Sequence, residues 1–123
     1  MSPTDPVAPR TVTELATAQL AAYNAADLDA FCACYHPDVT VLGADGDVRF
    51  AGLAAFRERY GTLFRDFTEV RGTVDERVTL GAHVIEREAW SRVERATGAR
   101  TSGTVLVRYT EADGLIRWAQ FFA

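Results

Sequence analysis

The feature that most constrains this chain is a long stretch with a period of two, residues 82–94, in its second half. Gly81 precedes the stretch and Gly98 follows it, and glycine is typical of turns, so the pattern predicts one long β-strand between two turns. Side chains of a strand alternate between its two faces. One face of this strand therefore carries an unusual mixture, namely Val84, Glu86, Glu88, Trp90 and Arg92.

Glu86 and Glu88 lie two positions apart on that face, which places them roughly 7 Å apart at the usual rise of a strand. If the face lines a pocket, repulsion between the carboxylates and loss of water favour the neutral form of at least one, which suits acid–base catalysis. If the face is exposed, both are ordinary solvated side chains, since most glutamates are exposed. The strand alone leaves both interpretations open.

Helical patterns occupy the first half of the chain, and strand patterns occupy the second. Thr11 and Glu14 have the spacing of a capping box at the start of a helix. Asp27 is a typical cap of a second helix, which ends before Pro37. The expected elements are helices at residues 12–25, 30–35 and 53–64, and strands at 39–42, 48–50, 68–80, 82–94, 101–109 and 115–122.

Helices followed by a meander of long strands predict an α+β fold, in which the sheet curls and the helices cover one of its faces. The chain has 123 residues, enough for one domain with a substantial core. We expect a disordered, proline-rich tail over residues 1–10, which has neither the apolar core nor the basic leader of a signal peptide. A single domain is expected over residues 11–123.

Composition argues against several classes of partner. The net charge of −4, from 13 basic and 17 acidic residues, disfavours nucleic acid and anionic membranes, because both require a basic face. No apolar run is long enough to span a bilayer. Cys32 and Cys34 should point in different directions on a helix, and with His36 and His83 they form no zinc pattern. We therefore expect reduced thiols and a cytoplasmic protein. Without a phosphate-binding loop or dinucleotide fingerprint, no cofactor is expected.

Three short motifs carry a resemblance to a known family: AYNAADLDAF at residues 22–31, YHPDV at 35–39 and DGLIR at 113–117. In these motifs the chain resembles the nuclear transport factor 2-like superfamily, and within it the SnoaL-like and ketosteroid isomerase-like small proteins. The resemblance implies a cone-like, curled antiparallel sheet wrapped around N-terminal helices. It also implies a deep apolar pocket for a small hydrophobic ligand and a homodimer formed through the outer sheet face. Such a scaffold hosts many chemistries, so it does not specify a reaction.

The catalytic pattern of ketosteroid isomerase is an aspartate base with a tyrosine and a protonated aspartate as oxyanion donors. When this pattern is laid along the chain from the motif at Asn24, the tyrosine falls on Gln19. The basic aspartate falls on Gly43 and the second aspartate on Val105. None of the three is retained, so we expect no steroid isomerase of that mechanism.

The same placement implies a different set of pocket residues. It combines aromatic side chains with a few convergent polar groups, as in most small-molecule sites. Glu86 and Glu88 would carry the chemistry. The residues expected to line the pocket around them are Gln19, Tyr23, Tyr60, Phe64, Trp90, Arg92, Val105, Trp118, Gln120 and Phe122. As alternatives, Trp90 and Trp118 could be core residues, and Arg92 could form a structural ion pair with a neighbouring glutamate.

Two functions remain open at this stage. The first is an enzyme that moves a proton on a small hydrophobic carbonyl compound, or opens or closes a ring beside the carbonyl. Glu88 would be the general base, and a protonated Glu86 would donate to the developing oxyanion, while Gln19 and Tyr60 orient the substrate. The second is a non-catalytic module that holds an apolar ligand or pairs with a partner through its sheet. In that case the glutamates are solvated or paired with arginines.

Overall fold

A computed structural model describes residues 10–123. The tail predicted for residues 1–10 lies outside the described residues, apart from Arg10. The Arg10 guanidinium contacts Cys34 Sγ at 3.8 Å. Residues 10–123 form three helices and one sheet of six strands. This arrangement confirms the predicted α+β class.

Each helix begins where a local signal predicts it or close by. Helix α1 spans Val12–Asn24, and its capping box is complete, since Thr11 and Glu14 each accept a hydrogen bond from the other's backbone N–H. Helix α2 spans Leu28–Cys32 and is capped by the Asp27 side chain. Helix α3 spans Leu53–Asp66 after Gly52, which adopts a φ of 90° that glycine tolerates.

The strands are β1 Tyr35–Leu42, β2 Val48–Ala51, β3 Phe67–Leu80, β4 His83–Glu94, β5 Arg100–Ala112 and β6 Leu115–Phe122. Their order in the sheet is β2-β1-β6-β5-β4-β3. Neighbours are antiparallel except β1 and β6, which pair in parallel, so the expectation of a wholly antiparallel sheet is corrected at this one junction. Parallel strands require a long connection, and here β2, α3 and three long strands separate β1 from β6 in the sequence.

The second helix is shorter, and β1 longer, than the sequence pattern predicts. Tyr35 already pairs with Ile116 of β6, so the chain is extended four residues before the expected start of the strand. Pro37 lies in the interval where the pairing with β6 is interrupted, between Tyr35 and Thr40. Proline has no N–H to donate to a ladder, which explains why the strand tolerates it there.

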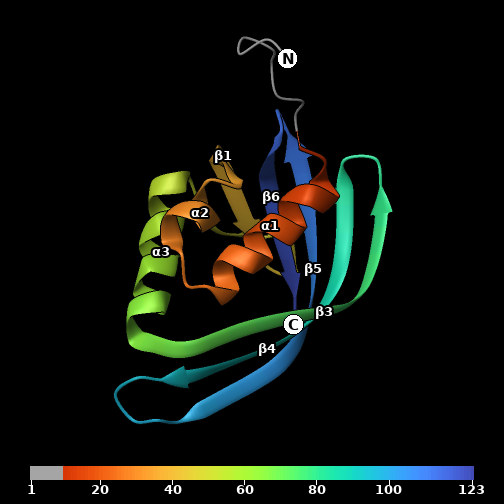
Figure 1. The fold of residues 1–123 in the computed structure, drawn as a ribbon. Coiled ribbons are helices and arrows are strands. Elements are labelled where there is room, and N and C mark those ends of the chain that lie inside the picture. The colour runs from red at the N-terminus through yellow and green to blue at the C-terminus, as the bar shows by residue number, and fades with distance from the viewer. Residues whose placement is uncertain (1–9) are drawn as a thin grey trace, which may run out of the picture.

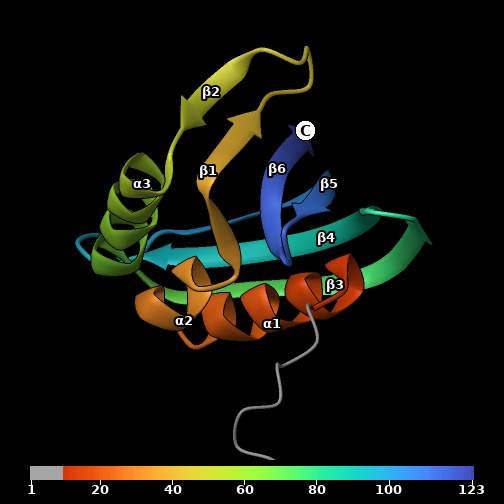
Figure 2. The same cartoon turned by 90° about the horizontal axis from the view of Figure 1, so that it is seen from above.

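The sheet curls, and the helices cover its concave side (Figures 1 and 2). Helix α1 packs mainly against α2 and β3, whereas α3 packs against α2, β1 and β3. An aromatic cluster joins the helices to the sheet, with Phe31 stacked on Phe56 and in contact with the rings of Tyr35 and Tyr60. The cluster fills only part of the cone. The space that remains lies between α1, α3 and the long strands.

Candidate functional site

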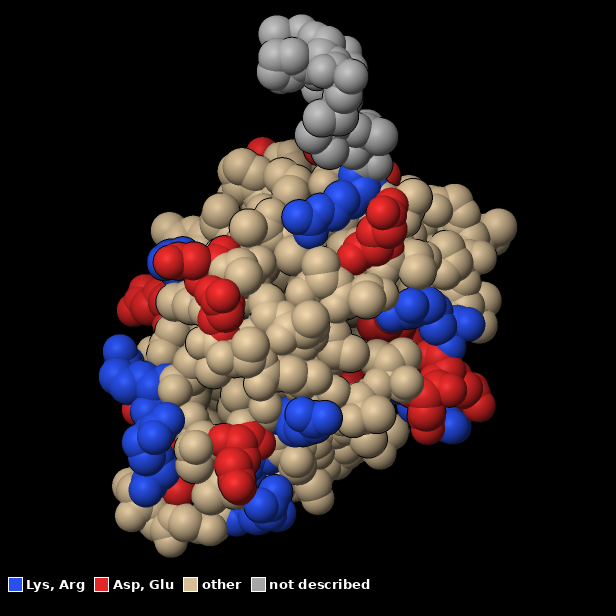
Figure 3. All heavy atoms as spheres, in the orientation of Figure 1, with Lys and Arg blue, Asp and Glu red and all other residues tan. Residues whose placement is uncertain are grey.

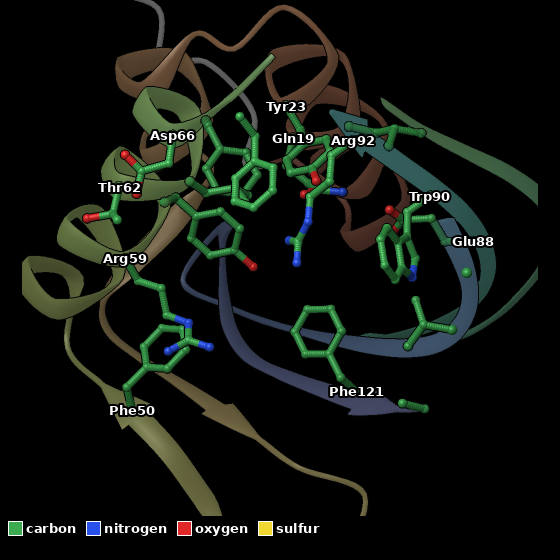
Figure 4. A pocket seen from close by; sticks show the side chains of 18 of the residues that line it. Gln19, Tyr23, Phe50, Arg59, Thr62, Asp66, Glu88, Trp90, Arg92 and Phe121 are labelled. Carbon is green, nitrogen blue, oxygen red and sulfur yellow. The ribbon is translucent and has the colours of Figure 1, made fainter. Parts of the chain in front are cut away.

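A cavity of about 890 Å³ occupies that remaining space. Side chains from α1, α3, β4, β5 and the end of β6 line it, and Figure 4 shows them converging from these elements. The lining is mostly apolar and aromatic, with a small number of polar groups, which is the composition of a small-molecule site. The cavity is therefore large enough for a ligand the size of a bicyclic or tricyclic molecule.

Glu88 supplies a carboxyl group to this cavity. Burial in apolar surroundings, with a smaller contribution from the charge of Glu86, raises the pKa of Glu88 to about 7. Among the described residues, none donates a hydrogen bond that would stabilise its ionised form. A carboxylate with a pKa near neutrality can both accept and return a proton at ordinary pH, which is the property a general base needs.

Glu86 does not line the cavity, although it shares a strand face with Glu88. Its side chain is 1% exposed, and one oxygen accepts a hydrogen bond from Arg77 Nε at 2.6 Å. The cause is the cross-strand register, because Arg77 of β3 lies directly opposite Glu86. The expected role of Glu86 as a donor inside the pocket is therefore not supported by its position. Its charge still reaches Glu88, as the pKa of Glu88 indicates.

Three tyrosines of the cavity lie within electrostatic reach of Glu88. Tyr23 and Tyr60 line the cavity, and burial together with the nearby Glu88 raises the pKa of both phenols. Tyr109 also lines the cavity, and burial together with the charge of Glu88 raises its pKa. Phenols with raised pKa values keep their protons, so they are hydrogen-bond donors at any working pH. No hydrogen bond to another described residue affects the hydroxyl of Tyr60. Tyr60 is thus the donor best suited to a ligand oxygen.

Gln19 lines the cavity from α1, as expected, but much of its amide is already used. The hydroxyl of Tyr35 donates to Gln19 Oε1 at 2.9 Å, and Gln19 Nε2 donates to the carbonyl of Ala16 at 3.1 Å. A primary amide has two N–H groups. One N–H of Gln19 therefore remains for a ligand.

Trp90, Arg92 and Val105 also line the cavity, on β4 and β5. The Arg92 guanidinium lies over the Phe67 ring at 4.5 Å and over the Trp90 ring at 5.2 Å. No carboxylate among residues 10–123 lies within ion-pair distance of Arg92, unlike the arginines paired with Glu86, Asp75 and Glu69. The structural ion pair weighed for Arg92 is therefore absent from the described chain.

Two glycines that were not among the expected site residues lie next to the cavity side chains of β4. Their lack of a side chain provides the space that Glu88 and Trp90 occupy. Gly72 and Gly103 are the cross-strand partners of Trp90 on either side. A Cβ atom on Gly72 would lie 2.6 Å from Glu88 Oε1, and one on Gly103 would lie 2.9 Å from the Trp90 indole. The available signal was an isolated glycine inside each long strand pattern, which often marks a close approach.

Four of the expected lining residues lie elsewhere. Phe64 packs against the ring of Tyr23 at 5.7 Å, within the aromatic cluster. In β6 the pairing with β5 is irregular around Arg117, since Thr110 faces Trp118 while Glu111 faces Ile116. An extra residue in one strand reverses the alternation beyond it. This bulge moves the following positions to the other face of β6, and the side chains displaced from the cavity are Trp118, Gln120 and Phe122. Trp118 and Phe122 are exposed, whereas Gln120 is buried and donates to the carbonyl of Gly43 at 3.1 Å.

The same bulge brings Phe121 into the cavity in place of its neighbours. The opposite wall is formed by Phe50 of β2 and Arg59 of α3. The Arg59 guanidinium lies 5.1 Å from the centre of the Phe50 ring. The sequence pattern missed these three residues. Arg59 and Phe50 come from elements that are close only in the tertiary structure, so no local signal could have joined them.

The described residues contain no group of three His, Cys, Asp or Glu side chains arranged to hold a metal ion. No helix in residues 10–123 is long and apolar enough to cross a membrane. On the face seen in Figure 3, basic and acidic side chains are interspersed, and neither sign forms a continuous patch.

Residues 16–119 match the SnoaL-like domain family. The chain belongs to this family of SnoaL-like domains, and its fold is that of nuclear transport factor 2-like and ketosteroid isomerase-like proteins. The resemblance noted in the sequence motifs is thereby confirmed. No curated protein matches the sequence.

Three solved structures illustrate the likeness. An LEH-like epoxide hydrolase from M. tuberculosis is 14% identical with a TM-score of 0.79, over 90% of this chain and 80% of that one. A candidate polyketide cyclase from Pseudomonas putida is 21% identical with a TM-score of 0.76, over 93% and 92%. A protein from Catenulispora acidiphila with a ketosteroid isomerase-like fold, solved with trimethylamine, is 16% identical with a TM-score of 0.76, over 93% and 87%. At such identities the likeness shows the fold alone.

Proposed function

We propose that this protein is an acid–base enzyme acting on a small hydrophobic carbonyl compound, with Glu88 as the general base. The observation that carries the proposal is the carboxyl group of Glu88, which lies in a largely apolar cavity with its pKa raised to about 7. Structural relatives that are described as a hydrolase and a candidate cyclase support an enzymatic use of such a cavity. The proposed reaction class is isomerisation or cyclisation, with ring-opening hydrolysis as a variant that uses the same base.

In the proposed reaction, ionised Glu88 removes a proton from the carbon beside the substrate carbonyl. The electron pair of the broken C–H bond forms an enolate, and the Tyr60 hydroxyl donates a hydrogen bond to its oxygen. In an isomerase, Glu88 returns the proton to a different carbon. In a cyclase, the enolate carbon attacks a second carbonyl of the substrate, and Glu88 protonates the new alkoxide. The apolar walls keep water away from the enolate.

The test is deuterium incorporation, followed by NMR, at the carbon beside the carbonyl in a panel of steroid enones, aromatic ketones and lactones. We expect exchange with at least one member by the wild type, and a rate about 10²- to 10⁴-fold lower in Glu88→Gln. The rate should rise with pH through about 7, because only ionised Glu88 accepts a proton. Glu94→Gln, on the same strand but outside the cavity lining, is the control. Equal rates in wild type and Glu88→Gln would contradict the proposal.

A second candidate is a non-catalytic domain that binds an apolar ligand in the same cavity. The observation that favours it is the absence of the ketosteroid isomerase pattern, whose positions are occupied here by Gln19, Gly43 and Val105. The two candidates differ in one measurable respect. If the protein is only a binding domain, both the wild type and Glu88→Gln bind the ligand, and neither one catalyses proton exchange on it.

We also propose that two copies of the chain associate through the outer sheet face. Val78 pairs with Ile85 across β3 and β4, and Leu106 pairs with Phe122 across β5 and β6. All four side chains are exposed large hydrophobic groups on the face opposite the cavity. Arginines lie directly across from Ile85 and Leu106 in the ladder between β4 and β5, so the face combines exposed apolar and basic side chains, a combination that an interface can bury.

The cytoplasm remains our proposed location. Cys32 and Cys34 are both free thiols in the described structure, which is compatible with a reducing compartment.

A further inference from the structure

The cavity contains a cation that the chain itself leaves without a counterion. Arg92 projects its guanidinium into the space between the helices and β4, as Figure 4 shows. Three other arginines on strands each lie within 4.0 Å of a carboxylate, namely Arg77, Arg87 and Arg100. Arg92 has none among residues 10–123, and its buried Nε has no hydrogen-bond partner there. Arg92 is partly buried, and buried N–H groups in proteins are normally paired, so its unpartnered Nε and its charge are available to a ligand in the cavity.

The local backbone explains why Arg92 is unpaired. The ladder between β3 and β4 is interrupted between Thr68 and Arg71, opposite Arg92, and Glu69 adopts a φ of 51°. Such a bulge removes the cross-strand neighbour that would otherwise supply a partner, and bulges are frequent beside binding sites. The guanidinium then lies with its central carbon 4.5 Å from the Phe67 ring centre and 5.2 Å from the Trp90 ring centre, within cation–π distance of both. Its N–H edge is left for a planar acceptor.

Glu88 does not serve as that acceptor. Burial and the charge of Glu86 raise the pKa of Glu88. None of the ion pairs in residues 10–123 joins its carboxyl group to Arg92. Both groups act on Tyr23, whose pKa is raised by Glu88 and lowered by Arg92. The cavity therefore presents a base and a cation at separate places, with Tyr23 within electrostatic reach of both.

We infer that the substrate carries a carboxylate, which Arg92 binds through a two-point hydrogen bond while the reacting carbon lies near Glu88. This inference rests on the proposed function, in that it takes the cavity to be the substrate site. A carboxylate fits better than a phosphate, because a carboxylate is planar and carries one charge, and Arg92 offers one planar guanidinium with one charge. The substrate class is thus an aromatic or alicyclic acid that also contains a carbonyl group.

The test compares the binding of naphthylacetate with that of naphthylacetamide, which has the same shape and no charge, by isothermal titration calorimetry. In the wild type we expect the acid to bind about tenfold to hundredfold more tightly than the amide, as for a charged hydrogen bond. Arg92→Gln should abolish this preference, and Arg92→Lys, which keeps the charge but loses the planar edge, should keep only part of it. Unchanged melting temperatures verify that both variants fold.

The matched control is Arg108→Gln, because the buried Nε of Arg108 also has no hydrogen-bond partner among the described residues, but Arg108 does not line the cavity. We expect this variant to retain the preference for the acid. Equal loss in both arginine variants, equal binding of acid and amide by the wild type, or no binding of the acid at millimolar concentration would each overturn the inference.

The outcome is independent of catalysis, because the readout is binding. Glu88→Gln should keep the preference for naphthylacetate. A wild type that prefers the acid but shows no proton exchange would retain this inference and lose the proposed base. A wild type that catalyses proton exchange but does not prefer the acid would retain the proposed base and overturn this inference.

Discussion

Glu88 is held in surroundings that oppose its ionisation, and this affects folding as well as chemistry. Its pKa is about 7 in the folded chain against an ordinary value of 4.5. The folded state therefore holds the proton more tightly than the unfolded state. Between these two values the free energy of unfolding falls as the pH rises, because ionisation favours the unfolded chain. The full penalty above the upper value is at most about 3 kcal/mol.

From this we predict that Glu88→Gln stabilises the protein, and that the gain depends on pH. Near pH 4.5 the variant and the wild type should have similar free energies of unfolding. Above about 7 the variant should be more stable, since it carries no buried charge. Urea denaturation across the pH range measures the difference.

Glu14→Gln is a control of opposite sign. Hydrogen bonds from Thr11 lower the pKa of Glu14, so its ionised form stabilises the fold above its ordinary pKa. The stability of Glu14→Gln relative to wild type should fall as the pH rises. If the stability of Glu88→Gln relative to wild type also fell as the pH rises, Glu88 would not be a buried carboxyl group with a raised pKa.

At the scale of elements, a single amide joins the end of α1 to the edge strand β3. Asn24 Oδ1 accepts from the Gly72 N–H at 2.7 Å, and Asn24 Nδ2 donates to the Gly72 carbonyl at 3.0 Å. The side chain thus provides both hydrogen bonds that a neighbouring strand would otherwise provide. Gly72 also lies against the Glu88 carboxyl group, so this contact helps to position the cavity wall.

We predict that Asn24→Ala destabilises the fold by about 1–3 kcal/mol, because two partly buried backbone groups lose their partners. The amide hydrogen of Gly72 should exchange with solvent more quickly as a result. Urea denaturation and hydrogen exchange provide the two measurements.

Thr13→Ala is the matched control, since Thr13 also joins α1 to β3, through an exposed hydroxyl contact with Thr79 at 3.1 Å. Its effect should stay within about 0.5 kcal/mol. Equal effects of the two substitutions would show that the Asn24 contact holds the strand no better than an exposed one.

At the scale of the whole molecule, the helices cover the concave side of the sheet and leave much of its convex side open (Figure 2). Ile85 and Leu106 lie on that open side and are 43% and 44% exposed. A C2 dimer would bury these side chains against their own copies. The cavity residues Glu88 and Trp90 lie on the other face of the sheet, so such an interface would not include them.

We predict that the wild type is a dimer by light scattering at micromolar concentration, and that Ile85→Arg or Leu106→Arg makes it a monomer. Opposed arginines at an isologous interface repel each other and lose the apolar contact. Val48→Arg is the control, because Val48 is 61% exposed but lies in β2, at the far edge of the sheet. A monomeric wild type would rule out the interface.

The sequence by itself determined the elements and the class of fold, because the signals for them are local. The Thr11–Glu14 capping box set the start of α1, and the period-two pattern with its flanking glycines set the long strands. The bounds of β6 agree with the pattern. Along the regular strand β4, alternation alone brought Glu88, Trp90 and Arg92 onto one face, and all three line the cavity.

Only the tertiary structure decided which of these side chains work together. Glu86 shares the face of Glu88 but is paired with Arg77, because β3 places that arginine directly opposite. Phe121 lines the cavity in place of the expected Phe122, because the pairing between β5 and β6 is irregular near Arg117. Register, bulges and burial depend on partners that are distant in the sequence, so a local pattern does not contain them.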